Sequence, residues 1–134
     1  MIDHFSLPVS DYARSRRFYD KALGALGYKV QMEVMDSPDY VGAGYGPANL
    51  PEPRFWIGAG RAPGPAPVTP AGQHIAFKAG NRAAVDAFHA TAPAAGGSDH
   101  GPPGLRPHYH PNYYAAFILD PDGHRIEAVC HHSE

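Results

Sequence analysis

The sequence predicts an α+β fold built from two copies of a strand–helix–strand–strand–strand (βαβββ) module. The first observation behind this prediction is an internal repeat. Alternating apolar residues in 2–9 indicate a strand that leads into a helix, and the pattern returns in 73–79, where His74 lies 70 residues after His4 (74 − 4). The second observation is the Asp120–Gly123 turn, which joins two β-prone runs as in a hairpin.

The first half contains one expected helix. Ser10 is a typical N-cap residue and Asp11 suits the positive end of a helix, which we expect to run to about Leu23. Gly24 and Gly27 then end this helix. Three strands are expected to follow, near residues 28–34, 40–45 and 54–58.

The second half begins after a linker. Residues 59–72 are rich in Pro, Gly and Ala and hold too little apolar content to pack as an element. Asn81 is expected to cap a second helix over 82–95, with a buried stripe made by Val85, Phe88 and Ala92. We therefore expect one domain over 1–134, with module one at 1–58, the linker at 59–72 and module two at 73–134.

Composition excludes several classes of protein. A chain of 134 residues suits a single domain with its own core. The net charge of −2 argues against a nucleic-acid or anionic-membrane partner, and no apolar run reaches membrane-spanning length. The single cysteine, Cys130, excludes an internal disulfide framework and fits a reducing compartment. No signal peptide is visible, so we expect a cytoplasmic protein.

Strand alternation also sorts the polar residues. In the last strand, one face holds Arg125, Glu127 and Val129, and the other holds Ile126, Ala128 and Cys130. A carboxylate in mid-strand is costly to bury without a partner. Because each helix is expected to cover the apolar face of its sheet, His4, His74 and Glu127 are expected to look into a shared cavity. His124 lies in the turn, where a structural role is expected.

Four stretches carry a resemblance to a known family. They are Asp3-His4, Ser10-Asp11 with Arg16-Arg17-Phe18-Tyr19, Gln73-His74-Ile75-Ala76-Phe77, and Asp120-Pro121-Asp122-Gly123-His124-Arg125-Ile126-Glu127. Over essentially all 134 residues the chain resembles the vicinal oxygen chelate superfamily, which includes glyoxalases, bleomycin-resistance proteins, extradiol dioxygenases and fosfomycin-resistance thiol transferases. The resemblance implies an eight-stranded mixed sheet that curls around a U-shaped cleft, a divalent metal and a homodimer.

The resemblance places His4, His74 and Glu127 at three metal-ligand positions of the superfamily. Two neutral imidazoles and one carboxylate suit Fe, Mn, Zn or Ni and leave open positions for a substrate or water. The identity of the metal stays open, and some members of the superfamily bind ligands with no metal at all.

One position departs from the glyoxalase pattern. Glyoxalases carry a fourth ligand, a glutamate, on the last strand of the first module. Matching the two halves puts this position at Trp56, or at Ile57 after a one-residue slip, and neither side chain binds metal. Glu52 lies in the preceding loop. A three-ligand site looks more like that of the dioxygenases or the thiol transferases, and Trp56 is expected to form a wall of the pocket.

A Pro-rich loop before the Tyr113–Leu119 strand supplies further candidates. His108 and His110 are two residues apart in an extended segment and are expected to point the same way. The loop is expected either to roof the cleft or to be an exposed connection. The first alternative makes His110 and Tyr114 candidate catalytic proton donors together with Glu127, and it makes substrate-pocket residues of Arg106, His108 and Tyr113.

Two classes of function follow from this pattern. The first is a metal-dependent lyase, isomerase or ring-opening dioxygenase acting on a small oxygen-rich molecule chelated by the metal, in which Glu127 also acts as a base. The second is a metal-free protein that binds and sequesters a small molecule, as bleomycin-resistance proteins do. A thiol transferase like the fosfomycin-resistance enzymes is a further alternative, and so is a domain that keeps the fold without a site.

Overall fold

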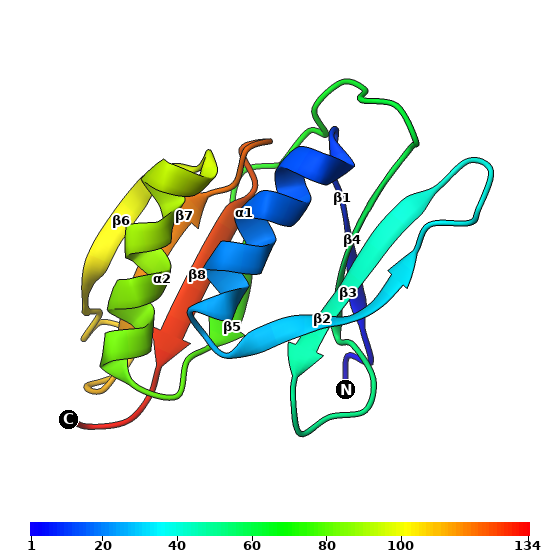
Figure 1. The fold of residues 1–134 in the computed structure, drawn as a ribbon. Helices are drawn as coiled ribbons and strands as arrows, with labels where there is room; N and C mark the ends of the chain where they lie inside the picture. The colour runs from blue at the N-terminus through cyan, green and yellow to red at the C-terminus, as the bar shows by residue number, and fades with distance from the viewer.

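Ten helices and strands make up the fold, and the computed structural model describes all residues from 1 to 134 (Figure 1). The first half contains β1 (Phe5–Pro8), α1 (Tyr12–Gly24), β2 (Tyr28–Val34), β3 (Val41–Pro47) and β4 (Phe55–Ala59). The second half contains β5 (Ile75–Lys78), α2 (Arg82–Ala95), β6 (Ser98–Leu105), β7 (Tyr114–Leu119) and β8 (Arg125–Cys130). The α+β class and the repeated βαβββ pattern are therefore confirmed.

The strands form two four-stranded sheets of the same topology. Their orders are β1-β4-β3-β2 and β5-β8-β7-β6, with β1–β4 and β5–β8 parallel and the other neighbours antiparallel. Within one chain the two sheets are not hydrogen-bonded to each other, so β1 and β5 are both free edge strands. The eight strands therefore form two separate four-stranded sheets within one chain, where one curled eight-stranded sheet was expected.

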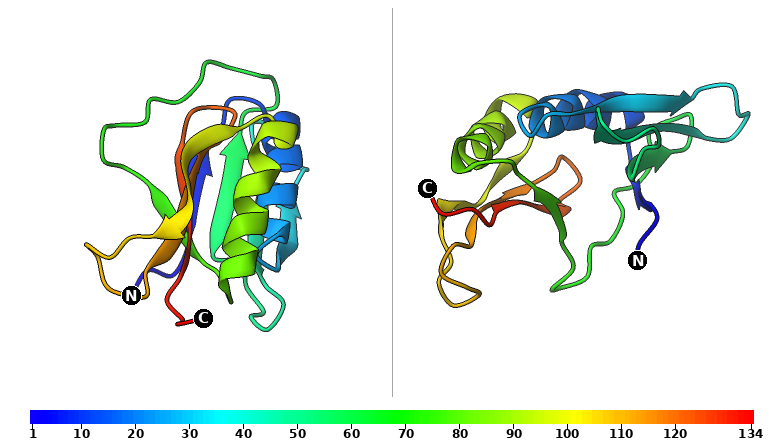
Figure 2. Two further views of the ribbon diagram at one scale, coloured as in Figure 1. Left: turned by 90° about the vertical axis from the view of Figure 1, so that its left-hand side faces the viewer. Right: turned by 90° about the horizontal axis from the view of Figure 1, so that it is seen from below.

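Each helix covers one face of its own sheet, and α1 and α2 also pack against each other (Figure 2). The buried residues of α2 are Val85, Phe88 and Ala92, as its apolar stripe predicts. On the sheets, the same core takes alternate residues such as Ile57, Ile126 and Cys130. The opposite face of each sheet carries no helix and is called the helix-free face below.

The helix caps confirm one prediction and correct another. Asn81 caps α2, because its side chain accepts a hydrogen bond from the Ala84 amide at 2.8 Å. The N-cap of α1 is Asp11, which accepts from the Arg14 amide at 2.9 Å; the prediction of Ser10 is wrong by one residue. The reason is that a buried carboxylate elsewhere in the chain engages both the amide and the hydroxyl of Ser10.

The loop expected at residues 101–112, before β7, is shorter than predicted, because its first part belongs to a strand. Residues 98–105 form β6, which pairs with β7 despite two prolines and two glycines. The register shifts twice along this pair, and Gly101 has a φ of 151°, which few other residues adopt. Such irregularities are typical of an edge strand, where prolines are tolerated because no second neighbour needs their missing N–H groups.

The Asp120–Gly123 turn joins the two modules. Asp122 is buried and accepts hydrogen bonds from the Ser10 amide at 2.8 Å, the Ser10 hydroxyl at 2.5 Å and the Arg14 guanidinium at 2.6 Å. Asp120 is buried as well and accepts from the Tyr19 hydroxyl at 2.7 Å. Two carboxylates of module two thereby accept hydrogen bonds from donors of module one, and these bonds hold the two modules in one relative orientation.

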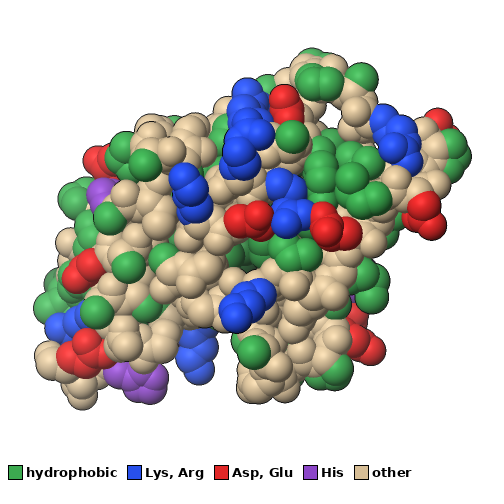
Figure 3. All heavy atoms as spheres, viewed as in Figure 1, with side chains coloured by type: hydrophobic (Ala, Val, Ile, Leu, Met, Phe, Trp, Pro, Cys, Tyr) green, Lys and Arg blue, Asp and Glu red, His purple; other side chains and the backbone are tan.

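Charges are mixed on the surface that carries the helices. In Figure 3, basic and acidic side chains lie interspersed over this face, and no large area carries one sign of charge. No helix of the chain is long and apolar enough to cross a membrane.

Replacing Asp122 by alanine should lower the free energy of unfolding by about 2–3 kcal/mol, because three donors lose a buried acceptor while Arg14 stays partly solvated. Urea denaturation of the wild type and Asp122→Ala measures this. Asp99→Ala is the matched control, since it removes an exposed carboxylate paired with His89 and should change little. Equal effects of the two substitutions would contradict the role given to the turn.

Asp120 should give the stability a defined pH dependence. Burial raises the pKa of Asp120 above its usual value of 3.8. As the pH rises past about 3.8, the unfolded chain loses this proton before the folded chain does, so the folded state loses stability until its own pKa is passed. Asn cannot titrate. The stability of the wild type relative to Asp120→Asn should therefore be higher near pH 4 than near pH 7 in urea denaturation; an unchanged difference contradicts the shift.

Candidate metal-binding site

Glu127 lies at the centre of the helix-free face of the second sheet. Its neighbours in the sheet are Ala76 of β5 and Phe117 of β7, and its side chain is 1% exposed. His74 directly precedes β5 and is 45% exposed, and its Nε2 lies 3.0 Å from Oε2 of Glu127. The pairing of β5 with β8 thus brings an imidazole and a carboxylate together, the first open to solvent and the second buried.

Tyr113 provides the second partner of Glu127. Its hydroxyl donates a hydrogen bond to Oε1 of Glu127 at 2.5 Å. Burial, and after it this hydrogen bond, raises the pKa of Tyr113 above its usual value of 10, so the hydroxyl stays protonated and remains a donor. Both carboxylate oxygens of Glu127 therefore have partners. The sequence predicted Tyr113 as a pocket residue, but not this contact.

His110 and His131 lie next to Tyr113. The Asn112 amide donates to Nδ1 of His110 at 3.1 Å, so neutral His110 carries its proton on Nε2. That Nε2 lies 2.7 Å from Nδ1 of His131, and the two rings stack at 5.0 Å. The Tyr113 ring packs edge-on against both rings. His110 lies beside the phenol of Tyr113, and no contact joins it to Glu127.

The other residues predicted from the loop fall in different places. The Arg106 guanidinium lies over the Phe117 ring at 5.8 Å, on the same face as Glu127. His108 packs on Tyr109 at 4.2 Å in the exposed part of the loop. Tyr114 lies on the helix side of β7, where its hydroxyl donates to Asp86 of α2 at 2.7 Å. Strand alternation puts Tyr114 on the opposite face from Glu127, so a catalytic role beside Glu127 has no support in the geometry.

His4 lies on the helix-free face of the other sheet. Its side chain is 58% exposed, and its Nδ1 lies 2.7 Å from Asp3. A cavity of about 260 Å³ is lined by Asp3, His4, Ser6, Glu52, Pro53 and Trp56. Trp56 is thus a wall of this cavity, as expected, and the loop residue Glu52 opens onto the same space as His4.

Glycines shape this first face in a way that the sequence did not predict. Gly42, Gly44 and Gly46 alternate along β3 on the helix-free side. A Cβ at Gly44 would lie 2.7 Å from Trp56, and one at Gly42 would collide with Tyr40. The missing side chains let two aromatic rings lie flat on the sheet. A glycine at every second position of a strand is the signal that indicates such a close approach.

The chain does not bring all three predicted ligands together. No group of three or more His, Cys, Asp or Glu side chains lies close enough to hold a metal ion. His74 and Glu127 have a separation that two ligands of one ion could have. Two ligand atoms that each lie about 2.1 Å from an ion are about 3.0 Å apart at a right angle and about 3.4 Å apart in tetrahedral geometry. The observed separation of the His74 and Glu127 atoms is 3.0 Å. His4 belongs to the other face.

The chain therefore belongs to the class of proteins built from two βαβββ modules. One helix-free face carries the His74–Glu127 pair, and the other carries His4. A model of the Glyoxalase/Bleomycin resistance protein/Dioxygenase superfamily matches residues 1–128, and the chain belongs to this superfamily. No curated protein matches the chain.

Solved structures show the same fold. A glyoxalase/bleomycin resistance protein from Albidiferax ferrireducens is 28% identical, with a TM-score of 0.69 and 96% of both chains covered. A domain of this kind from Frankia sp. is 18% identical, with a TM-score of 0.72 and 98% of both chains covered. A mutant of glyoxalase I from Zea mays is 24% identical with a TM-score of 0.77, and the match spans 45% of the maize chain.

Removing the Tyr113 hydroxyl tests its contact with the buried carboxylate. Tyr113→Phe should lower the free energy of unfolding by about 1–3 kcal/mol, because Oε1 of Glu127 loses its donor in a place that water does not reach. Tyr109→Phe is the control, since the Tyr109 hydroxyl makes no hydrogen bond and its side chain is exposed. Urea denaturation compares the two, and equal stabilities would contradict the contact.

Proposed function

We propose that the chain is a metal-dependent enzyme of the superfamily, a lyase, isomerase or ring-opening dioxygenase that acts on a small oxygen-rich molecule. Its ligand set is His74 and Glu127 on one helix-free face and His4 on the other. The observation that carries the proposal is the His74–Glu127 pair. Its Nε2 and Oε2 atoms lie 3.0 Å apart, as two ligands of one ion could, and the Glu127 carboxylate is buried. The resemblance of the sequence to the vicinal oxygen chelate superfamily also implies a divalent metal.

His74, Glu127 and His4 would hold the divalent ion, which would supply Lewis-acid chemistry to oxygen atoms of the substrate. The chain's own residues hold and orient the carboxylate. Tyr113 keeps one oxygen of Glu127 fixed by donating to it, which leaves the other oxygen facing His74. Arg106 adds a positive charge at the edge of the same face, where it suits an anionic group of a substrate. His110 and His131 are linked by a hydrogen bond beside Tyr113 and offer a route for a proton towards solvent.

The third ligand is proposed to come from a second copy of the chain. His4 and the His74–Glu127 pair lie on faces that do not meet within one chain, and both sheets end in free edge strands, β1 and β5. In a homodimer in which the first sheet of each chain lies against the second sheet of the other, His4 of each chain would lie beside the His74–Glu127 pair of the other. The dimer would then have two equivalent sites. It would also place Glu52 and Trp56 of one chain opposite Arg106 of the other.

A second candidate is a metal-free binding protein. Both oxygens of Glu127 already have protein partners, so its burial does not require an ion. Under this alternative the two helix-free faces form only the walls of a ligand pocket, and the flat rings of Tyr40 and Trp56 favour a planar molecule. A thiol-transfer reaction remains within the first proposal, because it uses the same ligand set.

Metal content decides between these alternatives. Two differently tagged chains, one with His4→Ala and the other with Glu127→Ala, are co-expressed without histidine-rich tags and the mixed dimer is isolated. If the ligands come from two chains, one site of the mixed dimer is intact, so elemental analysis should find about half the metal of the wild type. Each variant alone should bind almost none. Activity that follows the metal content links the site to catalysis.

The outcomes separate the parts of the proposal. Metal in the wild type but none in the mixed dimer would mean that all ligands come from one chain. No metal in any sample, even after Fe, Mn, Zn or Ni is added back, would contradict a metal-dependent enzyme and favour the binding protein. His108→Ala is the matched control, because it removes an exposed imidazole that packs on Tyr109 and contacts none of the three proposed ligands, and it should leave the metal content unchanged.

A further inference from the structure

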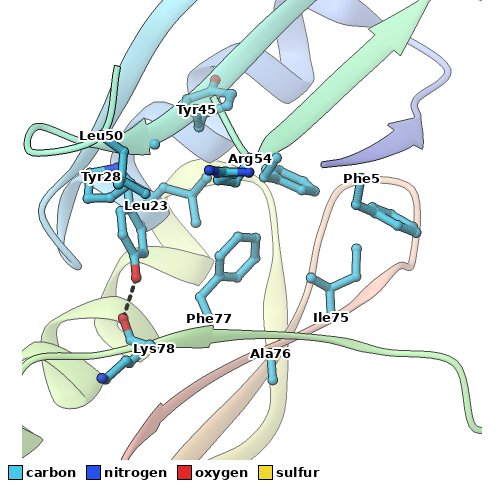
Figure 4. Close-up of a pocket in the computed structure, with 13 residues that line it drawn as sticks. Phe5, Leu23, Tyr28, Tyr45, Leu50, Arg54, Ile75, Ala76, Phe77 and Lys78 are labelled. Carbon is cyan, nitrogen blue, oxygen red and sulfur yellow. Dashed lines mark hydrogen bonds between the residues drawn. The ribbon is translucent and has the colours of Figure 1, made fainter. Parts of the chain in front are cut away.

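A second cavity lies between the modules, on the side of β5 opposite to Glu127. Its volume is about 340 Å³, and it is lined by Phe5, Leu23, Tyr28, Tyr45, Gly46, Pro47, Leu50, Arg54, Phe55 and residues 75–78. Figure 4 shows Phe77 and Ile75 rising from β5 towards residues of the first module. A cavity of this size lies at the small end of the range that holds small-molecule ligands.

The walls of this inter-module cavity are aromatic and ordered. Phe55 and Phe77 meet edge to face with ring centroids 5.0 Å apart, and Tyr28 lies 6.2 Å from Phe77. The Tyr28 hydroxyl donates to the backbone carbonyl of Lys78 at 2.6 Å, as the dashed line in Figure 4 marks. This bond uses the one polar atom that Tyr28 offers, so the wall presents the apolar ring to the cavity.

One cationic side chain points towards these apolar residues, that of Arg54. The Lys78 ammonium lies on the same side of β5 as Ala76, away from Ile75 and Phe77 (Figure 4). Arg54 uses only Nη1 for its contacts with Asp3, at 3.0 Å to the carbonyl and 3.3 Å to the carboxylate, which leaves Nε and Nη2 without a partner. No acidic side chain lines the cavity. The charge at its rim is therefore positive, while its interior is hydrocarbon.

From this combination we infer a second binding site, separate from the proposed metal site, that takes a small amphipathic anion: an aromatic or short aliphatic body with one carboxylate or sulfonate. The body packs on the apolar wall that Phe55 and Phe77 form, and the anionic group pairs with the free nitrogens of Arg54. Strand alternation separates the two sites, since Ile75 and Phe77 face the cavity while His74 belongs to the other face of the strand.

The fluorescent anion anilinonaphthalene sulfonate is the first probe. Titration of the folded protein should show saturable binding of about one dye per chain, and decanoate or naphthoate should displace it, which tells aliphatic from aromatic bodies. Decanol has the same body as decanoate without the charge and should compete at least about tenfold more weakly. Equal competition by decanol, or binding that does not saturate, would overturn the proposal.

Variants place the site in the cavity. Arg54→Gln should weaken binding of the dye and of decanoate about tenfold. Arg17→Gln is the matched control, since it removes an exposed arginine of α1 outside the cavity, and it should have no effect. Ile75→Glu puts a carboxylate at the cavity and should abolish binding. Equal affinities of the two arginine variants would overturn the site.

A measurement on the wild type covers the case of a variant that fails to fold. Amide chemical shifts should change on addition of decanoate at Gly46, Leu50 and residues 75–78, which line the cavity, and remain constant around Tyr113 and Glu127. Changes confined to any other region would contradict the placement. If Ile75→Glu instead converts a dimer to a monomer while wild-type shifts do not respond to decanoate, a second copy of the chain occupies the cavity and the ligand proposal is wrong.

Discussion

The burial of two carboxylates in one turn determines how the modules are arranged. Asp120 and Asp122 can leave water because donors of module one, the Tyr19 and Ser10 hydroxyls among them, replace it together with amides of the turn itself. His124 of the same turn contacts the Pro8 carbonyl at 2.8 Å, at the end of β1, and β8 begins with the next residue. The strand that follows His4 and the strand that carries Glu127 are therefore tied at one end, and the positions of the two helix-free faces are fixed together.

This rigid connection explains why the candidate ligands are divided. With α1 and α2 packed side by side and the turn buried between the modules, moving His4 towards Glu127 would break the hydrogen bonds and the ion pair that Asp120 and Asp122 make with module one. A second chain can present its own His4 without breaking these bonds. The fold is therefore compatible with the proposed site shared between two copies, and the free edges of β1 and β5 offer unpaired backbone groups to such a contact.

The sequence predicted what depends on local periodicity. The limits of α2 match the predicted 82–95, and β2, β3 and β4 lie within two residues of their predicted positions, because alternation, caps and glycines act over a few residues. β1 begins three residues later than the predicted start at residue 2. The same reasoning missed what depends on partners distant in sequence. Ser10 has the chemistry of a cap but serves Asp122, and the proline-containing β6 is a strand because β7 offers it an edge. Tyr113 could be placed near the site, while its bond to Glu127 depends on a register that no local pattern defines.

The short strand β5 separates the two proposed binding sites. Four residues long and paired only with β8, it sends Ile75 and Phe77 into the inter-module cavity, while His74 at its start contacts Glu127. An edge strand bound on one side only is easier to displace than a central one. Any ligand that shifts β5 in the cavity must therefore move His74 relative to Glu127, and a 3.0 Å pair tolerates little movement if it is to hold an ion. Because such coupling is reciprocal, an ion on His74 would in turn change the affinity of the cavity for its ligand.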